Sequence, residues 1–134
     1  MAFGTATVLT SVGKAITAKR LLGATPAQAE PKYLALGVGA TGAARTAVAA
    51  DTALSSELAE GRSGTNAGTT VTTTVTNDTY QVVQTITATG TRSVDEAGLF
   101  DASTAGNMFL SATFPVVSLL NGDSLQITSK VQYT

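Results

Sequence analysis

Residues 71–88, which read VTTTVTNDTYQVVQTITA, carry the clearest structural signal of this chain. Valine alternates with threonine before Asn77-Asp78, and apolar residues alternate with polar ones after it. Asparagine and aspartate are typical of the short turns that join antiparallel strands. Folding the chain at this turn places Val75 opposite Tyr80, so that apolar residues of both arms lie on the same side. The stretch therefore predicts a β-hairpin with one buried face.

Other segments also predict strands. Residues 125–133 show the cleanest alternation, with apolar side chains on one face and polar ones on the other. Residues 108–114 alternate too, and Asn121-Gly122-Asp123 supplies a turn between these two segments. Residues 32–38 are expected to form a buried strand and residues 3–10 a short one. Several short strands at this spacing predict a mainly β fold, an antiparallel β-sandwich or jelly-roll-like barrel with one short helix.

Helical patterns are brief. Residues 12–22 have a weak helical pattern. Further along, Asp51 is a suitable N-cap, and Leu54 and Leu58 lie four residues apart on one helical face. This second pattern predicts a helix of two turns that begins at Asp51.

The chain divides at about residue 32. Residues 23–31 contain two of the three prolines, and the residue before a proline favours an extended conformation. We therefore expect a loop there, which separates an N-terminal arm or extension over residues 1–32 from a single β domain over residues 33–134.

The composition excludes several kinds of chemistry. The 134 residues include no cysteine and no histidine, so disulfides, thiolate nucleophiles and histidine-based catalysis or metal binding are ruled out. We expect no enzyme and no cofactor. The eight basic residues are scattered, which argues against nucleic-acid binding. No apolar run is long enough to span a membrane, and the stretch before Ala27-Gln28-Ala29 is too short and polar for a signal peptide.

The surface is expected to carry few charges. Only 13% of the residues are charged, against about 25% in ordinary soluble proteins. Two interpretations stay open: a surface covered by neighbouring copies in an assembly, or a polar, uncharged β surface.

Three patterns resemble binding motifs. Residues 37–42, GVGATG, have the glycine spacing of a dinucleotide site, but the expected helix and parallel strand do not follow. Asp95, Glu96 and Asp101 form the tightest acidic cluster and could begin a calcium site, although a solvated turn or an inter-subunit salt bridge is the favoured interpretation. Leu99-Phe100 is either a partner anchor or part of a loop that tucks into the core.

Five short phrases stand in order along residues 33–132. They read YLALGVG at 33–39, ADTALSSE at 50–57, DEAGLFDA at 95–102, MFLSATF at 108–114 and GDSLQI at 122–127, with Arg62 after the second. Together they resemble a pattern in small structural proteins of tailed bacteriophages. The resemblance implies a virion protein, either a capsid decoration (cement) protein or a tail-fibre-like one, and it brings no catalytic residues.

The favoured function is a decoration protein on the capsid surface that bridges neighbouring major capsid protein subunits. A tail or tail-fibre-associated module, with receptor or carbohydrate binding, is the alternative. We expect a homo-oligomer, either a dimer or a trimer, because closed symmetry is usual in such assemblies. The residues expected to contact a partner are Phe3, Val8 and Leu9 in the arm, and Leu99 and Phe100 in the β domain.

Overall fold

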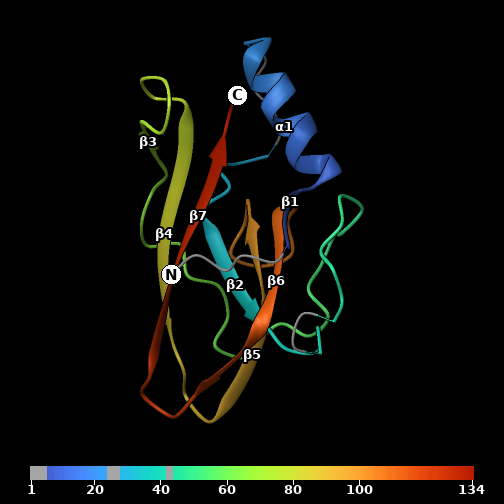
Figure 1. Cartoon of the computed structure of the whole chain (residues 1–134), viewed down its shortest axis with the longest axis vertical. Helices are drawn as coiled ribbons and strands as arrows, with labels where there is room; N and C mark the ends of the chain where they lie inside the picture. Colours follow the sequence, from blue (N-terminus) through green and yellow to red (C-terminus); the bar gives the residue numbers. More distant parts are fainter. Residues whose placement is uncertain (1–5, 24–27, 42–43) are drawn as a thin grey trace.

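The computed structural model describes residues 6–23, 28–41 and 44–134 (Figure 1). Within them the chain is mainly β, with two antiparallel sheets in a sandwich-like arrangement and one helix, which confirms the predicted fold class. The elements in chain order are β1 (Ala6–Leu9), α1 (Ser11–Leu21), β2 (Tyr33–Gly37), β3 (Thr69–Val71), β4 (Thr79–Thr87), β5 (Arg92–Phe100), β6 (Met108–Leu119) and β7 (Ser124–Gln132).

The two sheets differ in size. Sheet A has the strand order β1-β6-β5-β2, and sheet B has the order β3-β4-β7. Their inner faces bury one apolar core, because alternate residues of each strand point toward the opposite sheet. Sheet A contributes Leu34 and Phe114 to this core, and sheet B contributes Val82 and Ile127. The predicted strands at 32–38, 108–114 and 125–133 are confirmed as β2, part of β6 and β7.

The hairpin predicted at Asn77-Asp78 has a longer loop than expected. β3 pairs with β4 so that Thr70, and not Val75, lies opposite Tyr80. The Asp78 carboxylate accepts hydrogen bonds from the backbone N–H groups of Thr73, Thr74 and Val75, at 2.8, 2.8 and 3.0 Å. Because of these bonds, residues 73–75 form a loop around the Asp78 carboxylate and do not take part in the β3–β4 pairing. Val75 is consequently 67% exposed, and the predicted register was wrong.

β5 is the strand that the sequence pattern did not reveal. It lies between β6 and β2, and every residue from Val94 to Phe100 is buried. A strand buried on both faces shows no alternation of polar and apolar residues. A register shift between Val94 and Glu96 places the β6 residues around Pro115 at a bulge, where a missing backbone N–H is tolerated.

The outer face of sheet A is covered by the irregular segment of residues 38–63. The two-turn helix predicted from Asp51 does not form, and residues 51–63 are irregular apart from isolated β-bridges. Instead Gly37 and Glu57 form an isolated β-bridge, and Leu54 packs against a small buried cluster that contains Phe100 and Met108. Sheet B, sheet A and this segment therefore form three successive layers.

Residues 6–9 are built into sheet A as β1. β1 pairs with β6 through four residue pairs, from Ala6 opposite Thr113 to Leu9 opposite Leu110. α1 follows at once and confirms the weak helical pattern of residues 12–22. Residues 6–21 therefore contact β6 through both β1 and α1, while the division into an arm or extension over residues 1–32 and a β domain over residues 33–134 stays a prediction.

Candidate partner-binding surface

α1 is held against β6 by its first turn. Thr10 is the N-cap: its hydroxyl accepts a hydrogen bond from the Gly13 N–H at 3.0 Å and donates one to the Met108 carbonyl. Its backbone N–H donates to the Phe109 carbonyl at 3.0 Å. Ile16, one turn further, is 3% exposed and joins the main core. The N-terminal half of α1 is therefore fixed, while its C-terminal half extends beyond the sheets (Figure 1).

An apolar groove lies between the C-terminal half of α1 and the ends of β4 and β7. Its volume is about 650 Å³. α1 contributes four of the lining residues, and the aromatic ones are Tyr80, Phe109 and Tyr133. The lining residues are Ile16, Thr17, Arg20, Leu21, Glu30, Pro31, Tyr80, Phe109 and Tyr133.

Tyr80 is held in the groove by an aromatic contact and a hydrogen bond. Tyr80 and Phe109 meet edge to face, with ring centroids 6.2 Å apart and an interplanar angle of 82°. The Tyr80 hydroxyl donates to the Pro31 carbonyl at 3.0 Å. Burial, followed by the nearby Glu30 carboxylate, raises the pKa of Tyr80 well above its usual value. Tyr80 is therefore a neutral hydrogen-bond donor at every physiological pH.

Large apolar side chains are exposed in the groove and next to it. Leu21 and Leu22 are 85% and 82% exposed, and Tyr133 is 49% exposed. Isolated exposed leucines are common, but adjacent ones next to an apolar groove are typical of a surface that binds a partner. We call the groove together with Leu22 the α1 surface.

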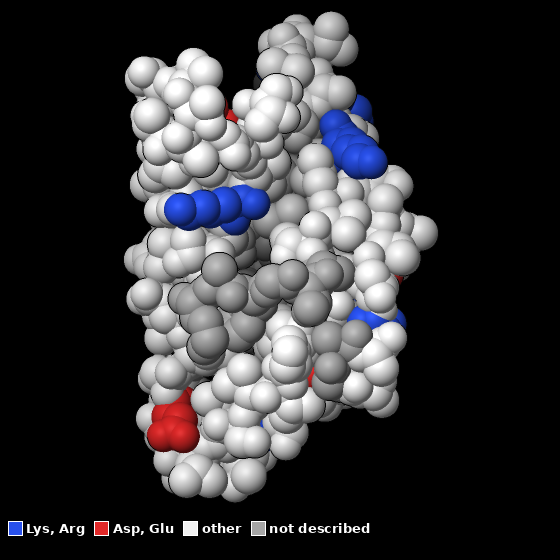
Figure 2. Space-filling model, in the orientation of Figure 1, with Lys and Arg blue, Asp and Glu red and all other residues white. Residues whose placement is uncertain are grey.

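Few charges interrupt the exterior. Figure 2 shows a face on which the Lys, Arg, Asp and Glu side chains stand well apart. At the groove the lining includes one cation, Arg20, and one anion, Glu30. Glu30 also accepts a hydrogen bond from the Gly68 N–H at 2.6 Å, which ties the β2 side of the groove to the loop before β3.

The partner-contact residues predicted from the sequence lie elsewhere. Phe3 is outside the described residues. Val8 and Leu9 are half-buried in β1, and Leu9 packs against the core. Leu99 and Phe100 are 1% and 2% exposed and lie in a strand instead of a loop, so this pair offers no surface to a partner.

One feature of the sequence points to the α1 surface. Leu21 and Leu22 are consecutive, and consecutive residues of a helix point about 100° apart. At most one of them could face the core. The groove itself depends on how α1 docks on β6, which the sequence pattern does not reveal.

The three carboxylates of the predicted acidic cluster, Asp95, Glu96 and Asp101, accept hydrogen bonds from different parts of the chain. Asp95 accepts a hydrogen bond from the Ala40 N–H at 3.1 Å. Asp101 holds a turn through Asn107, whose backbone N–H and side-chain amide donate at 2.6 and 2.8 Å. Over the described ranges, no three carboxylates lie close enough together to hold a metal ion.

Glu96 holds the layer over sheet A. Its side chain is fully buried, and it accepts hydrogen bonds from the Ser55 N–H at 2.6 Å, the Ser56 N–H at 3.2 Å and the Arg45 guanidinium at 2.7 Å. Arg45 also bonds the Asp51 carboxylate at 3.2 Å. Burial opposes ionisation of Asp51, but hydrogen bonds, the largest from the Ser111 hydroxyl, lower its pKa below the usual value.

The glycine motif at residues 37–42 has a packing role at its first position. A Cβ atom at Gly37 would lie 2.7 Å from the Glu96 carboxylate and 3.0 Å from the Ser56 carbonyl. This glycine lets the segment after β2 approach Glu96 closely. Gly42, at the other end of the motif, lies outside the described residues.

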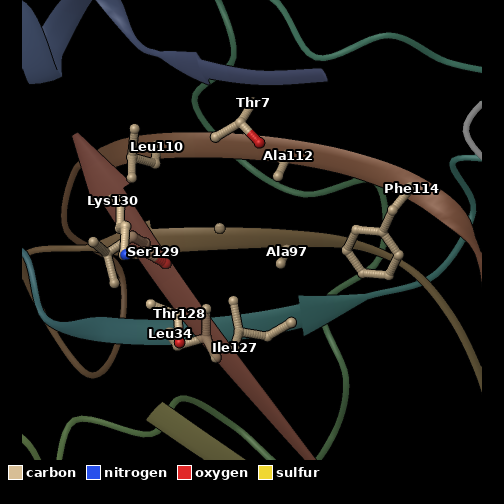
Figure 3. A pocket seen from close by; sticks show the side chains of 12 residues that line it. Thr7, Leu34, Ala97, Leu110, Ala112, Phe114, Ile127, Thr128, Ser129 and Lys130 are labelled. Atoms are coloured by element: carbon tan, nitrogen blue, oxygen red, sulfur yellow. The ribbon is translucent and has the colours of Figure 1, made fainter. Parts of the chain in front are cut away.

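A second hollow lies between the sheets. This cavity has a volume of about 420 Å³. Figure 3 shows β7 crossing the strands of sheet A, with Phe114 at one end of the cavity and Lys130 near the other. Ala97 and Ala112 line its sheet A wall with small side chains, and Ser129 contributes from β7.

In the part of the chain that the structure describes, no helix has the length and apolar character needed to cross a membrane. Comparisons with family models, with curated proteins and with solved structures give no match for this chain. Its function is therefore inferred from the chemistry of its own surface and from the sequence.

Proposed function

We propose that this chain is a non-enzymatic structural protein of a virion, and specifically a capsid decoration (cement) protein that bridges neighbouring major capsid protein subunits. The observation that carries the proposal is the α1 surface, where exposed Leu21 and Leu22 adjoin an apolar groove. The sequence resemblance over residues 33–132 supports the virion context, and the sandwich-like fold suits a rigid module that binds through one end.

The energetics favour attachment in many copies. Complete burial of one leucine side chain contributes about 1.5–3 kcal/mol. Two leucines at a partner contact thus contribute about 3–6 kcal/mol before the cost of association is subtracted. A single copy would bind weakly, whereas copies joined in an oligomer would bind with greater avidity. This arrangement suits a protein that attaches to a repetitive shell.

Location in the virion is the first test. An antibody against this chain, detected with gold particles by electron microscopy of the parent virion, should label the head. Label confined to the tail would overturn the decoration role and favour the tail module. Absence of label on intact and on gently disrupted virions would overturn the virion proposal altogether.

The contribution of the α1 surface is tested by the double variant Leu21→Gln/Leu22→Gln. We expect at least tenfold weaker binding to undecorated capsids in co-sedimentation, since a loss of about 1.4 kcal/mol already corresponds to a factor of ten. Glutamine has a helix propensity close to that of leucine, so α1 should persist.

Leu120→Gln is the matched control. Leu120 is 64% exposed and lies in the connection between β6 and β7, at the opposite end of the molecule from α1 (Figure 1). Its replacement should leave binding unchanged. Equal binding by the double variant and the wild type would show that the α1 surface is not the attachment site.

A further inference from the structure

We propose that β7 pairs with β7 of a second copy about a twofold axis, so that the two B sheets join into one continuous six-stranded sheet. This inference rests on the fold and on the sequence of one strand. It does not depend on the virion role.

β7 is an outermost strand with a regular backbone. Its strand neighbour in sheet B is β4, and the order β3-β4-β7 leaves its other side unpaired among the described residues. Nine consecutive residue pairs join β4 and β7 without a register shift. A long strand edge without a bulge is the geometry that accepts another strand.

Hydrogen bonds at the two ends of the β4–β7 pairing show which backbone N–H and C=O groups of β7 point toward β4 and which point away from it. The Ala88 N–H donates to the Asp123 carbonyl at 2.8 Å, and the Tyr133 N–H donates to the Asp78 carbonyl at 2.9 Å. In an antiparallel ladder, hydrogen-bonded pairs alternate with non-hydrogen-bonded ones. Odd-numbered residues of β7 therefore bond to β4. The N–H and C=O groups that point to the open side belong to Ser124, Gln126, Thr128, Lys130 and Gln132.

The side chains of this strand are arranged almost symmetrically about Ser129. On the face toward sheet A, Ile127 and Val131 lie two residues either side of Ser129, and Leu125 and Tyr133 lie four residues either side. On the other face, Gln126 and Gln132 are equally spaced from the same centre, as are Thr128 and Lys130. A strand with this pattern matches a reversed copy of itself.

This symmetry selects one register. With Ser129 opposite Ser129 of the second copy, Ile127 lies opposite Val131 of the second copy, and every apolar residue faces an apolar one. A register centred on Thr128 would place Ile127 opposite a serine. One centred on Ile127 would place Val131 opposite Asp123. Apolar cross-strand pairs stabilise a sheet, so the register centred on Ser129 is favoured.

Charge does not oppose the pairing. Lys130 is the single charged residue of β7. Exposed sheet edges are usually protected by several charges, a proline or a bulge. In the favoured register Lys130 lies opposite Thr128 of the second copy, so no like charges are directly opposed.

Cysteine cross-linking tests the register, because the chain has no cysteine of its own. Across the twofold axis Ser129 forms a non-hydrogen-bonded pair, in which the Cα atoms lie about 4.5 Å apart. That separation lies within the range of about 4.4–6.8 Å that a disulfide spans. Ser129→Cys should therefore form a covalent dimer under mild oxidation, seen on non-reducing gels.

Thr128→Cys is the matched control from the same strand. In the favoured register residue 128 lies diagonally from residue 128 of the second copy, and their Cα atoms are more than about 7 Å apart, too far for a disulfide. We expect at least tenfold less cross-linked dimer than for Ser129→Cys. Equal cross-linking of the two variants, or none with Ser129→Cys, would overturn the register.

The mass in solution tests the pairing itself. Light scattering after size exclusion should give the wild type twice the monomer mass of 13.5 kDa. Thr128→Pro removes an N–H that points to the open edge and leaves the bonds to β4 in place, so it should give a folded monomer. Thr128→Ala should remain dimeric, with circular dichroism confirming that both variants fold. A monomeric or trimeric wild type would overturn the proposal.

Discussion

Small side chains set the distance between α1 and sheet A. At Gly13 a Cβ atom would lie 2.5 Å from the Phe109 carbonyl oxygen and 2.8 Å from the Leu9 side chain. Backbone and core atoms cannot move aside as a flexible surface side chain can. The position of α1, and with it the wall of the groove, therefore depends on the absence of a side chain at this position.

Gly13→Ala is expected to destabilise the protein despite the better helix propensity of alanine. The propensity gain is about 1 kcal/mol. Displacing α1 from β6 should cost more than that, because inserting one carbon into a packed contact costs about 1–3 kcal/mol. Urea denaturation should show a net loss of stability, and Lys14→Ala, on the exposed face of the same turn, should not. A Gly13→Ala variant more stable than the wild type would contradict the tight contact.

Among the elements, β5 and the segment of residues 38–63 depend on each other. The described residues of this segment form no helix or strand, only isolated β-bridges, and the segment is held by the buried Glu96 carboxylate, which binds Arg45 and two backbone N–H groups. Removal of a buried acceptor leaves those donors unsatisfied. The carboxylate therefore replaces the secondary structure that the segment lacks.

Glu96→Ala is expected to lower the free energy of unfolding by about 3–5 kcal/mol, the usual cost of breaking a buried ion pair. Hydrogen exchange should accelerate at the amides of Ser55 and Ser56 and remain unchanged in α1. Glu57→Ala is the comparison: the Glu57 side chain is 33% exposed whereas that of Glu96 is fully buried, so the loss of Glu57 should cost less and should leave exchange at Ser55 unchanged. Unchanged exchange at Ser55 in Glu96→Ala would refute the role of Glu96.

The same elements show what the sequence can and cannot predict. β7 and β2 were predictable because alternation or a short apolar run is a local property of the chain. β5 was not, because burial of both faces removes the alternation. The helix expected from Asp51 had the right local residues. It does not form because the Ser55 and Ser56 N–H groups bond to Glu96, forty residues away in the chain.

The candidate site was less predictable than the fold. The α1 surface requires that a helix near residue 20, a turn near residue 30 and the last strand meet at one end of the molecule. The alternation or helical spacing of residues within one segment does not tell which other segments that segment will contact in the folded protein. The sequence pattern at Leu99 and Phe100 is compatible with a partner contact, but the fold buries both side chains.

For the molecule as a whole, the cavity between the sheets marks incomplete packing. Ala97 lines it and is 4% exposed, so a larger side chain can enter the space without reaching solvent. Ala97→Val should raise the free energy of unfolding by about 0.5–2 kcal/mol, as cavity-filling substitutions commonly do.

Ala88→Val provides the comparison in thermal denaturation. Ala88 is 2% exposed and belongs to the core but does not line the cavity. A larger side chain there should crowd its neighbours and lower the melting temperature. Destabilisation by both valines would show that the space beside Ala97 is already filled in solution.

The pairing of β1 with β6 has a consequence for how the protein is made. Residues 6–9 of β1 pair with residues 110–113 of β6, and β2 pairs with β5, so both early strands pair with strands that lie late in the sequence. On the ribosome, β1 and β2 are therefore translated well before β5 and β6, the strands with which they pair. Sheet A can close only after residues 108–119 of β6 have left the exit tunnel, so the early segments are those that a chaperone would meet unfolded.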